Sequence, residues 1–420
     1  MKRRDFIKNT ATGLALSSLP IWLNNCSIQS NKKPNIVLFL VDDMGYEVPG
    51  FNGGTSYNTP NIDKLAATGM KFTYCYSAPV CSPSRTQLLT GRYTFRTGEE
   101  WGVLPENETT ISSLLQNAGY KTAIVGKWQF GKIGDDPSFI NRKGFDEYCC
   151  WGWHEGPRYW NPWIWENGKV KENISDRYGP DVLRDFSIEF MQRSKDQPFF
   201  LYYPMLLTHF AKTGGKYTEP VGPNGEYQSY ADMVANLDRI IGEFTEALNN
   251  SGLAEDTIII FTTDNGTPEG IISNMGDRKI PGGKKSMKDT GTHVPLVVNW
   301  KGKLKPGSVN ENLIDFTDFF PTLLGLAEQE KPKNLKIDGK SFKRQLREED
   351  SVSRKWAYQE WHGEAWIRNK EWKLYRDTKL FNISEDPNED KPYYPETDTQ
   401  KSQKMRRVLT EYLAELDSTK

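Results

Sequence analysis

The chain has 420 residues, of which 26% are charged and 37% are hydrophobic, and its formal net charge is −1. This length is enough for one large domain with a smaller one beside it. A charge so close to zero excludes a strong field over the whole surface, so we predict no nucleic-acid partner. Five cysteines in a chain of this size exclude a small fold stapled by disulfides, and their odd number argues against complete pairing.

Residues 1–30 have the composition of an export signal. Arg3 and Arg4 precede a short apolar run, TGLALSSLPIWL, and together they resemble a twin-arginine signal. The run is too short to predict a helix that spans a membrane. Cys26 follows in LNNC, and two interpretations stay open: a lipidated cysteine that anchors the protein to a membrane, or a plain signal peptide cut nearby. Both predict an exported protein, either periplasmic or lipoprotein-anchored.

Apolar runs alternate with helical patterns from residue 33 onward. The run NIVLFLV (35–41) is continuously apolar, which is typical of a buried parallel strand. A helix is predicted over 60–68, with Thr59 as its N-cap and Gly69 as its stop. The alternation predicts an α/β domain with a mostly parallel sheet. Further strands are predicted at 121–126, 198–205, 257–263 and 294–300, and further helices at 110–118, 179–194 and 229–251.

The pattern changes past about residue 335. Residues 355–384 predict short antiparallel strands, with turns at RNKEW and RDTK. Residues 401–416, KSQKMRRVLTEYLAEL, predict a closing helix. We therefore divide the chain into the export signal (1–30), a large catalytic domain (33–335) and a C-terminal α+β subdomain (336–420).

Two of the predicted strands end in oxygen ligands. Asp42 and Asp43 follow the first strand, and Asp264 and Asn265 follow the strand at 257–263. Because ligands of open α/β sheets gather at the carboxyl ends of strands, we expect the two pairs to meet. Three carboxylates and one amide oxygen suit Ca²⁺ or Mg²⁺ better than zinc. Either pair alone would more often be an ordinary turn, so the prediction depends on both.

Cys81 stands in APVCSPSRTQLLTGRY (78–93), with no cysteine in CxxC spacing and no histidine beside it. The segment CSPSRTQLLTGR resembles the signature of type I sulfatases, the formylglycine-dependent branch of the alkaline phosphatase superfamily. Further motifs follow the order of that family: NIVLFLVDDMG, NTPNIDKLAATGMKF, GYKTAIVGKW, KGFDEY, TTDNG, GGKKSMKDTGTHVPLVVNWKG and DFFPTLLGLA. The resemblance covers most of the chain from about Lys33. It implies an alkaline-phosphatase-like fold, with a large, mostly parallel sheet sandwiched by helices.

The resemblance implies that a maturation enzyme converts Cys81 to formylglycine (3-oxoalanine), an aldehyde. In such enzymes the hydrated aldehyde lies against the metal, here expected to be Ca²⁺ with Mg²⁺ as the alternative. One hydroxyl attacks sulfur and expels the substrate alcohol. The second hydroxyl then loses its proton, the carbonyl re-forms and sulfate is eliminated. The resemblance thus places Cys81 among the metal ligands and explains why it need not act as a thiol.

The same motifs imply roles for four more residues. Arg85 matches the arginine that braces the hydrate and the metal-side carboxylates. Lys127 in GKW and Lys284 in GGKK match two sulfate-binding lysines, and Lys284 is also a candidate acid for the leaving group. Lys285 is adjacent, and the sequence alone does not distinguish it from Lys284. His209 in YYPMLLTHF stands where the family has a histidine that contacts sulfate and can protonate the leaving oxygen.

One position departs from the family pattern. Sulfatases of this type read GKWH, in which the histidine holds the second hydroxyl and helps to release sulfate, whereas this chain reads GKWQFG. Gln129 can hold a hydroxyl by a hydrogen bond but cannot accept its proton near pH 7. The departure leaves the base for sulfate release open. We favour an active subfamily that uses another base.

An aromatic segment, WGWHEGPRYWNPWIW (151–165), follows KGFDEY, where the substrate-facing insertions of the family begin. Indole faces suit the apolar faces of sugar rings, and His154 and Arg158 are candidates to bind hydroxyls or sulfates. His362, beside Trp361 in QEWHGEAW, is a candidate for the same rim. Each tryptophan alone is explained about equally well by packing in the core.

These patterns predict an exported hydrolase of sulfate esters, with a sulfated glycan as the expected substrate class. A phosphonate or phosphodiester hydrolase of the same superfamily is the enzymatic alternative, because such enzymes share the fold and can share formylglycine. A catalytically silent glycan-binding relative is the alternative from another class, and Gln129 and the tryptophans favour it.

Overall fold

The computed structural model describes residues 33–98, 101–209, 220–347 and 353–420. The predicted export signal and Cys26 lie outside these residues. Residues 33–420 form one compact unit. Within the described residues, no helix is both long enough and apolar enough to cross a membrane, and Cys75, Cys81, Cys149 and Cys150 are buried free thiols.

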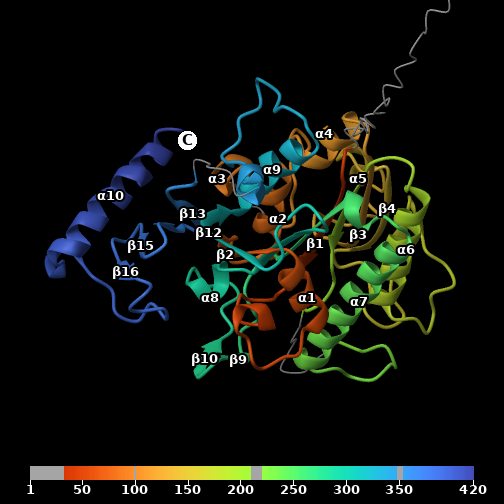
Figure 1. The fold of residues 1–420 in the computed structure, drawn as a ribbon, viewed down its shortest axis with the longest axis horizontal. Coiled ribbons are helices and arrows are strands. Elements are labelled where there is room, and N and C mark those ends of the chain that lie inside the picture. The colour runs from red at the N-terminus through yellow and green to blue at the C-terminus, as the bar shows by residue number, and fades with distance from the viewer. Residues whose placement is uncertain (1–32, 99–100, 210–219, 348–352) are drawn as a thin grey trace, which may run out of the picture. The chain divides into compact units, whose positions relative to one another are not determined.

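The described residues form a sheet of ten strands, in the order β12-β2-β11-β8-β1-β7-β3-β4-β5-β6 (Figure 1). Its centre is β1 (Asn35–Val41), which pairs in parallel with β8 (Thr257–Thr263) on one side and with β7 (Phe199–Pro204) on the other. Beyond β7, the parallel pairing continues through β3 (Lys121–Trp128) to β4 (Glu147–Gly152). The predicted mostly parallel sheet is confirmed.

The other five strands of the sheet extend this pattern or run against it. β11 (Leu296–Trp300) is antiparallel to both of its neighbours, β8 and β2 (Met70–Tyr76). β12 (Ser308–Asp315) then closes this edge in parallel with β2. At the other edge, β5 (Trp165–Glu166) and β6 (Lys169–Val170) form a short antiparallel hairpin beside β4.

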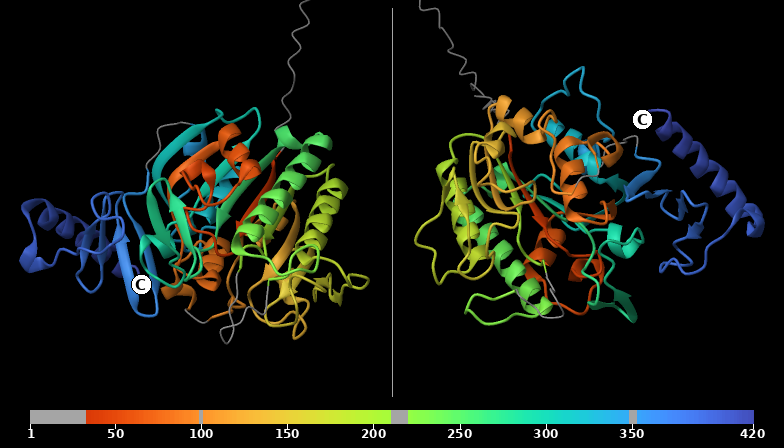
Figure 2. Two further views of the ribbon diagram at one scale, coloured as in Figure 1. Left: turned by 90° about the horizontal axis from the view of Figure 1, so that it is seen from below. Right: turned by 180° about the vertical axis from the view of Figure 1, so that it is seen from behind.

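Helices cover both faces of the sheet, because the side chains of β1 alternate between two cores (Figure 2). Its odd-numbered residues belong to a core shared with three helices: α1 (Pro60–Thr68), α6 (Gly179–Arg193) and α7 (Tyr230–Asn250). Its even-numbered residues belong to a second core with four others: α2 (Cys81–Thr90), α4 (Ile111–Asn117), α5 (Phe139–Arg142) and α9 (Phe319–Leu326). Burial on both faces explains why the sequence of β1 is apolar without alternation.

A second, smaller sheet follows near the C-terminus, as predicted. It is antiparallel, and its strands lie in chain order: β13 (Ala357–Trp361), β14 (Glu364–Arg368), β15 (Trp372–Tyr375) and β16 (Leu380–Asn382). The closing helix α10 (Gln400–Asp417) packs its apolar residues against this sheet (Figure 1). The remaining short elements are α3 (Thr94–Thr97), α8 (Asp289–Thr292), β9 (Ile272–Met275), β10 (Arg278–Pro281) and 3-10 turns at 50–52, 254–256, 316–318, 343–347 and 395–397.

A buried ion-pair network joins the small sheet to α8. Arg368 of β14 donates from Nη1 to both carboxylate oxygens of Asp289, each at 2.7 Å. Lys373 of β15 donates to Asp289 at 3.1 Å and to Glu389 at 2.9 Å. Although burial alone would raise the pKa of Asp289, the charges of Arg368 and Lys373 hold it below its usual value. The network therefore depends on an ionised Asp289.

Arg368→Ala should lower the free energy of unfolding at pH 7 by about 3 kcal/mol, because it leaves a buried carboxylate short of a cation. Urea denaturation checks this, with Arg407→Ala as the control, since the Arg407 side chain is 76% exposed. Because the pKa of Asp289 is lowered in the folded state, the pair contributes fully above about pH 4 and the difference should shrink below it. Equal stabilities of wild type and Arg368→Ala at pH 7 would contradict the assignment.

Candidate active site

The two predicted pairs of oxygen ligands meet at the carboxyl edge of the large sheet. β1 and β8 pair in register up to their last residues, so the residues that follow emerge side by side. The backbone N–H of Asp43 donates to Asp264 Oδ1 at 3.2 Å, and Asn265 Nδ2 donates to Asp43 Oδ1 at 2.9 Å. Asp42, Asp43, Asp264 and Asn265 are all buried. The structure thus brings all four together.

Two residues that the sequence did not single out hold the backbone of this turn. Thr208 Oγ1 lies within hydrogen-bond distance of the carbonyl oxygens of Asp42 (3.2 Å) and Asp43 (3.1 Å). The hydroxyl of Tyr230, in α7, donates to the carbonyl of Asp43 at 3.0 Å. Asp43 has a φ of 62°, a left-handed conformation that aspartate tolerates better than most residues. These bonds hold the backbone of both aspartates in place.

Arg85 and Lys127 provide positive charge beside the carboxylates. Arg85, in α2, donates to Asp264 Oδ2 from Nε (3.0 Å) and from Nη2 (2.7 Å). Lys127, in β3, donates to Asp42 Oδ2 at 2.6 Å. Although burial would raise the pKa of Asp42, the charges of Lys127, Arg85 and Lys284 hold it below its usual range. Asp42 is therefore ionised at neutral pH.

The structure distinguishes Lys284 from Lys285. Lys284 Nζ lies 2.6 Å from each carboxylate oxygen of Asp43. Burial would lower the pKa of Lys284, but the charge of Asp43 raises it, so Lys284 is protonated. The side chain of Lys285 is exposed, and its backbone N–H donates to the carbonyl of Pro79 at 2.9 Å. Lys284 is thus the lysine of the site.

Cys81 is the first residue of α2, a helix in which all ten residues are buried. Its Sγ and one carboxylate oxygen each of Asp42 and Asp264 lie within 4.8 Å of one another. Burial and the charges of the two carboxylates raise the pKa of the thiol, although Lys127 and Lys284 oppose the shift. A protonated, buried thiol is a poor nucleophile. This arrangement agrees with the interpretation that Cys81 does not act as a thiol.

The buried oxygens fit a hard cation. Among the described residues, Asp42 Oδ1 and Asn265 Oδ1 are buried without a hydrogen-bond partner. Burial and the charge of Asp42 raise the pKa of Asp43, and they raise that of Asp264 to about 7, although Arg85 opposes the shift. Buried polar atoms are normally paired, and clustered carboxylate and amide oxygens without hydrogen-bond partners are what Ca²⁺ and Mg²⁺ bind. The four residues could therefore hold such an ion.

His209 and Gln129 follow neighbouring strands of the sheet. His209 comes after β7, and its Nε2 lies 3.9 Å from Asp43 Oδ2. Burial and the positive charges of Lys284 and Arg158 lower the pKa of His209 well below its usual value, so the ring is neutral at pH 7. Gln129 comes directly after β3; its side chain is buried, and its Oε1 has no hydrogen-bond partner within the described part of the chain.

The chain has four histidines, and the structure describes them all. His293 is partly buried and stacks on tyrosine rings. His154 and His362 are exposed. His209 is therefore the histidine that lies beside the carboxylates, and no second histidine takes the place that Gln129 leaves.

The tryptophans of 151–165 divide between the core and the surface. Trp151 is 2% exposed and belongs to a hydrophobic core, whereas Trp163 is 44% exposed. Trp160 and Trp165 are partly buried against the two cores. Trp153 is also partly buried, and its ring contacts the ring of His154 at a centroid distance of 4.5 Å. Packing thus explains part of this segment.

The predicted substrate-binding residues lie at different places around the site. The guanidinium of Arg158 lies 4.2 Å over the ring of Trp151, and its charge acts on His209. The hydroxyl of Tyr159 lies 2.9 Å from the carbonyl of His209, which ties this segment to the site. The ring of His362 lies 4.0 Å from that of Trp361.

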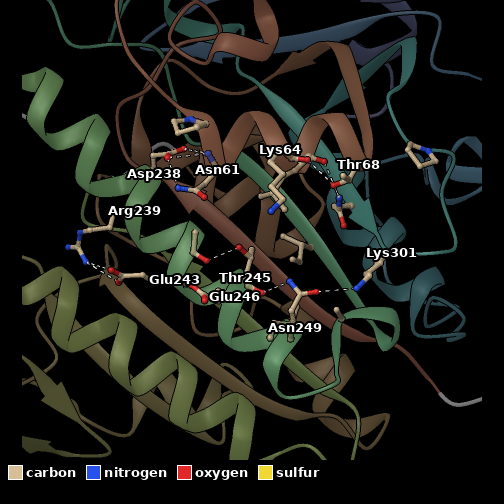
Figure 3. Close-up of a pocket in the computed structure, with 18 of the residues that line it drawn as sticks. Asn61, Lys64, Thr68, Asp238, Arg239, Glu243, Thr245, Glu246, Asn249 and Lys301 are labelled. Carbon is tan, nitrogen blue, oxygen red and sulfur yellow. Dashed lines mark hydrogen bonds and ion pairs between the residues drawn. The ribbon is translucent and has the colours of Figure 1, made fainter.

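A cavity of about 1030 Å³ lies elsewhere, beside α1 and α7 (Figure 3). Its lining includes none of the predicted site residues. Asp238 accepts hydrogen bonds from the first turn of α1, and Arg239 donates to Glu243 at 2.9 and 3.0 Å. Lys301 Nζ donates to Asn249 Oδ1 at 3.2 Å. These polar side chains bond one another, and the cavity is separate from the candidate active site.

Comparisons with known proteins identify the family. The sulfatase family model matches residues 34–329, and a model for the C-terminal part of N-sulphoglucosamine sulphohydrolase matches residues 283–418. The chain is 33% identical over 345 residues to N-acetylgalactosamine-6-sulfatase of Mus musculus, a match that covers 73% of this chain and 65% of the mouse protein, less than two thirds of its length. It is 30% identical over 399 residues to the uncharacterized sulfatase YdeN of Escherichia coli (strain K12), with 80% and 69% covered.

A crystal structure of Ps i-CgsB has the same fold. It superposes with a TM-score of 0.76 at 28% identity, and 92% of each chain is covered. The family model matches well over half of the chain, and the matched range includes the segment around Cys81. This protein therefore belongs to the sulfatase family of the alkaline phosphatase superfamily.

Proposed function

We propose that this protein hydrolyses sulfate esters of a carbohydrate. The observation that carries the proposal is the set of charges around Cys81: its thiol lies within 4.8 Å of carboxylate oxygens of Asp42 and Asp264, and the charges of Lys127 and Lys284 both act on it. The relatives support the class of substrate. The mouse relative is named for a sulfated amino sugar, and Ps i-CgsB has been crystallised with k-i-k-neocarrahexaose.

Lys127 and Lys284 are proposed to bind the sulfate group. A sulfate ester placed over Cys81 would meet two ammonium groups, and charge-assisted hydrogen bonds to its oxygens are the strong kind. His209, which lies beside the same Asp43 oxygen as Lys284, has one ring N–H to donate because it is neutral. Lys284 is protonated and can also supply a proton toward the leaving oxygen.

Cys81 is proposed to be converted to formylglycine by a maturation enzyme. The hydrated aldehyde would supply a hydroxyl nucleophile and a second hydroxyl through which sulfate is released. Arg85 binds one oxygen of Asp264 with two N–H groups and so fixes the orientation of that carboxylate.

A divalent metal is proposed to complete the site. The ion, with Ca²⁺ favoured over Mg²⁺, would be held by Asp42, Asp43, Asp264 and Asn265, and would lower the pKa of the nucleophile and polarise the sulfate. The raised pKa values of Asp43 and Asp264 support this, because a cation would offset the burial and the repulsion from Asp42 that raise them.

Protein co-expressed with a formylglycine-generating enzyme should release sulfate from at least one sulfated sugar. The panel is N-acetylgalactosamine 6-sulfate and oligosaccharides of chondroitin sulfate, heparin and carrageenan. Bis(p-nitrophenyl) phosphate and an aryl phosphonate test the enzymatic alternative. Cys81→Ala should lower the rate by about 10³-fold or more, because it removes the nucleophile.

A complete protein carries both formylglycine and metal. Mass spectrometry of the peptide that contains residue 81 checks the first, and metal analysis checks the second. Faster turnover of the phosphorus esters than of every sulfate would favour the phosphonate or phosphodiester hydrolase. A complete protein that turns over nothing would contradict the proposal and favour a silent glycan-binding relative.

Asp264→Ala should lose metal and activity together, because the remaining ligands no longer enclose the ion. Wild-type protein dialysed against Ca²⁺ should hold about one ion per chain by mass spectrometry of the elements, and Ca²⁺ should raise its Tm. Asp390→Ala is the matched control, since this aspartate is 62% exposed and far along the chain from the site. Full metal content in Asp264→Ala would rule out the proposed ligand set.

Gln129→Ala should lower turnover about tenfold to a hundredfold, since a hydrogen bond to a reacting hydroxyl contributes roughly 1–3 kcal/mol. Gln129→His should leave the burst of alcohol release nearly unchanged. Its sulfate release should rise with pH as the new imidazole loses its proton. Burst and steady-state kinetics with an aryl sulfate separate the two steps. If both phases are the same in Gln129→Ala and in wild type, residue 129 has no catalytic role.

A further inference from the structure

Aromatic rings from three distant segments of the chain form one continuous row. The ring of Trp101 lies 6.3 Å from that of Trp153 and 5.8 Å from that of Trp361, measured between centroids. A histidine extends the row at each end: His154 lies 4.5 Å from Trp153, and His362 lies 4.0 Å from Trp361. The sequence pointed to Trp361 and to the segment of Trp153, but it did not indicate Trp101, which joins them.

The row lies at the outer side of two hydrophobic cores: Trp153 and Trp361 pack against them, but neither is fully buried. Its three tryptophans are only partly buried, and both of its histidines are exposed. Trp128 and Trp366, by contrast, are core tryptophans with 1% and 0% exposure. Neighbouring rings are tilted by 37° to 75° against each other, so the row offers apolar ring faces and edges in different orientations, with an imidazole at each end.

The row is connected to the helix that begins at Cys81. The backbone N–H of Gly102 donates to the hydroxyl of Ser82, the residue after Cys81, at 3.2 Å. The ring of Trp153 packs directly on Gly102, since a Cβ at this position would lie 2.2 Å from it. Gly102 also has a φ of 74°, which favours glycine. Two successive contacts thus connect the catalytic helix α2 to the middle of the row.

The C-terminal sheet holds the far end of the row against the same helix. Gln359, in β13, accepts a hydrogen bond from Gln87 of α2 at 2.9 Å. Glu360 accepts hydrogen bonds from Thr94 Oγ1 at 3.0 Å and from the backbone N–H of Phe95 at 2.6 Å. Trp361 is the next residue of this strand. Its position relative to Cys81 is therefore fixed by buried and partly buried hydrogen bonds.

We propose that this row binds the sugar units that adjoin the sulfated unit, so that the protein recognises sulfated oligosaccharides better than sulfated monosaccharides. The inference rests on the proposed function and specifies its substrate. The C–H faces of pyranose rings would pack on the three indoles, and His154 and His362 would bond the hydroxyls at either end. Five rings form the row, with neighbouring centroids 4.0 to 6.3 Å apart, which is more aromatic surface than a single sugar ring covers.

Binding is tested by calorimetry on protein that carries Cys81→Ala, so that no ligand is consumed. The probes are k-i-k-neocarrahexaose and hexasaccharides of chondroitin 6-sulfate and heparin, with N-acetylgalactosamine 6-sulfate as the monosaccharide. At least one hexasaccharide should bind more tightly than the monosaccharide. Trp153→Ala and Trp361→Ala should each raise its Kd about tenfold or more. Trp361→Phe, which keeps a flat ring, should recover most of the affinity.

Trp163→Ala is the matched control, because this tryptophan belongs to the same segment as Trp153, is 44% exposed and stands outside the row. It should bind each probe as the parent does, and Tm measurements show that all variants fold. The inference is overturned if no hexasaccharide binds more tightly than the monosaccharide, or if both alanine variants bind as the parent does.

Sulfate release by protein with an intact, converted Cys81 decides the proposed function separately. Binding through the row without sulfate release would refute the proposed function and keep the inference. Sulfate release together with binding that does not depend on the tryptophans would refute the inference alone.

Discussion

Buried negative charge at the ends of β1 and β8 is the constraint that organises the rest of this structure. In-register pairing places Asp42 and Asp43 beside Asp264 away from water, where unbalanced carboxylates are costly. Separate elements therefore supply positive charge to the same point: Arg85 from α2 and Lys127 from β3. Lys284 arrives from a loop, and the segment after β7 holds the backbone of the turn. Motifs that are far apart along the chain thus meet at one point of the fold.

The sequence predicts helices and strands well where the burial of apolar residues determines them. It does not predict the direction of a strand or the hydrogen-bond partners of a side chain as well. The strand at 35–41 and the helix at 60–68 have the predicted bounds. The apolar run at 294–300 forms a strand, but its antiparallel direction in β11 leaves no mark on an apolar pattern. Thr59 precedes α1 as predicted, yet its hydroxyl accepts from Gly50 and bonds Asp63 instead of capping the helix. The bond from Gly50 depends on how the turn at residues 50–52 packs beside α1, which the sequence of α1 does not show.

The candidate site shows the same division. Charged residues inside motifs could be found, because a chemical role restricts both residue type and spacing. Choosing between Lys284 and Lys285 needed the backbone direction of one loop. Thr208 and Tyr230 bind backbone carbonyls, a contact that many residue types can make and that has no sequence signature. The role proposed for Trp101 depends on its contacts with Trp153 and Trp361, which lie dozens and hundreds of positions away in the sequence.

The complete burial of α2 has a consequence for the order of events in the life of the protein. Cys81 is 2% exposed, at the start of a helix that lies between the large sheet and the C-terminal strands. An enzyme that oxidises the thiol of Cys81 has to bind the segment around this residue, and in the folded protein that segment is buried. The proposed conversion therefore competes in time with folding, and chains that fold first are committed to the unmodified form. The fraction of active molecules would then be set during synthesis and would be independent of later exposure to the maturation enzyme.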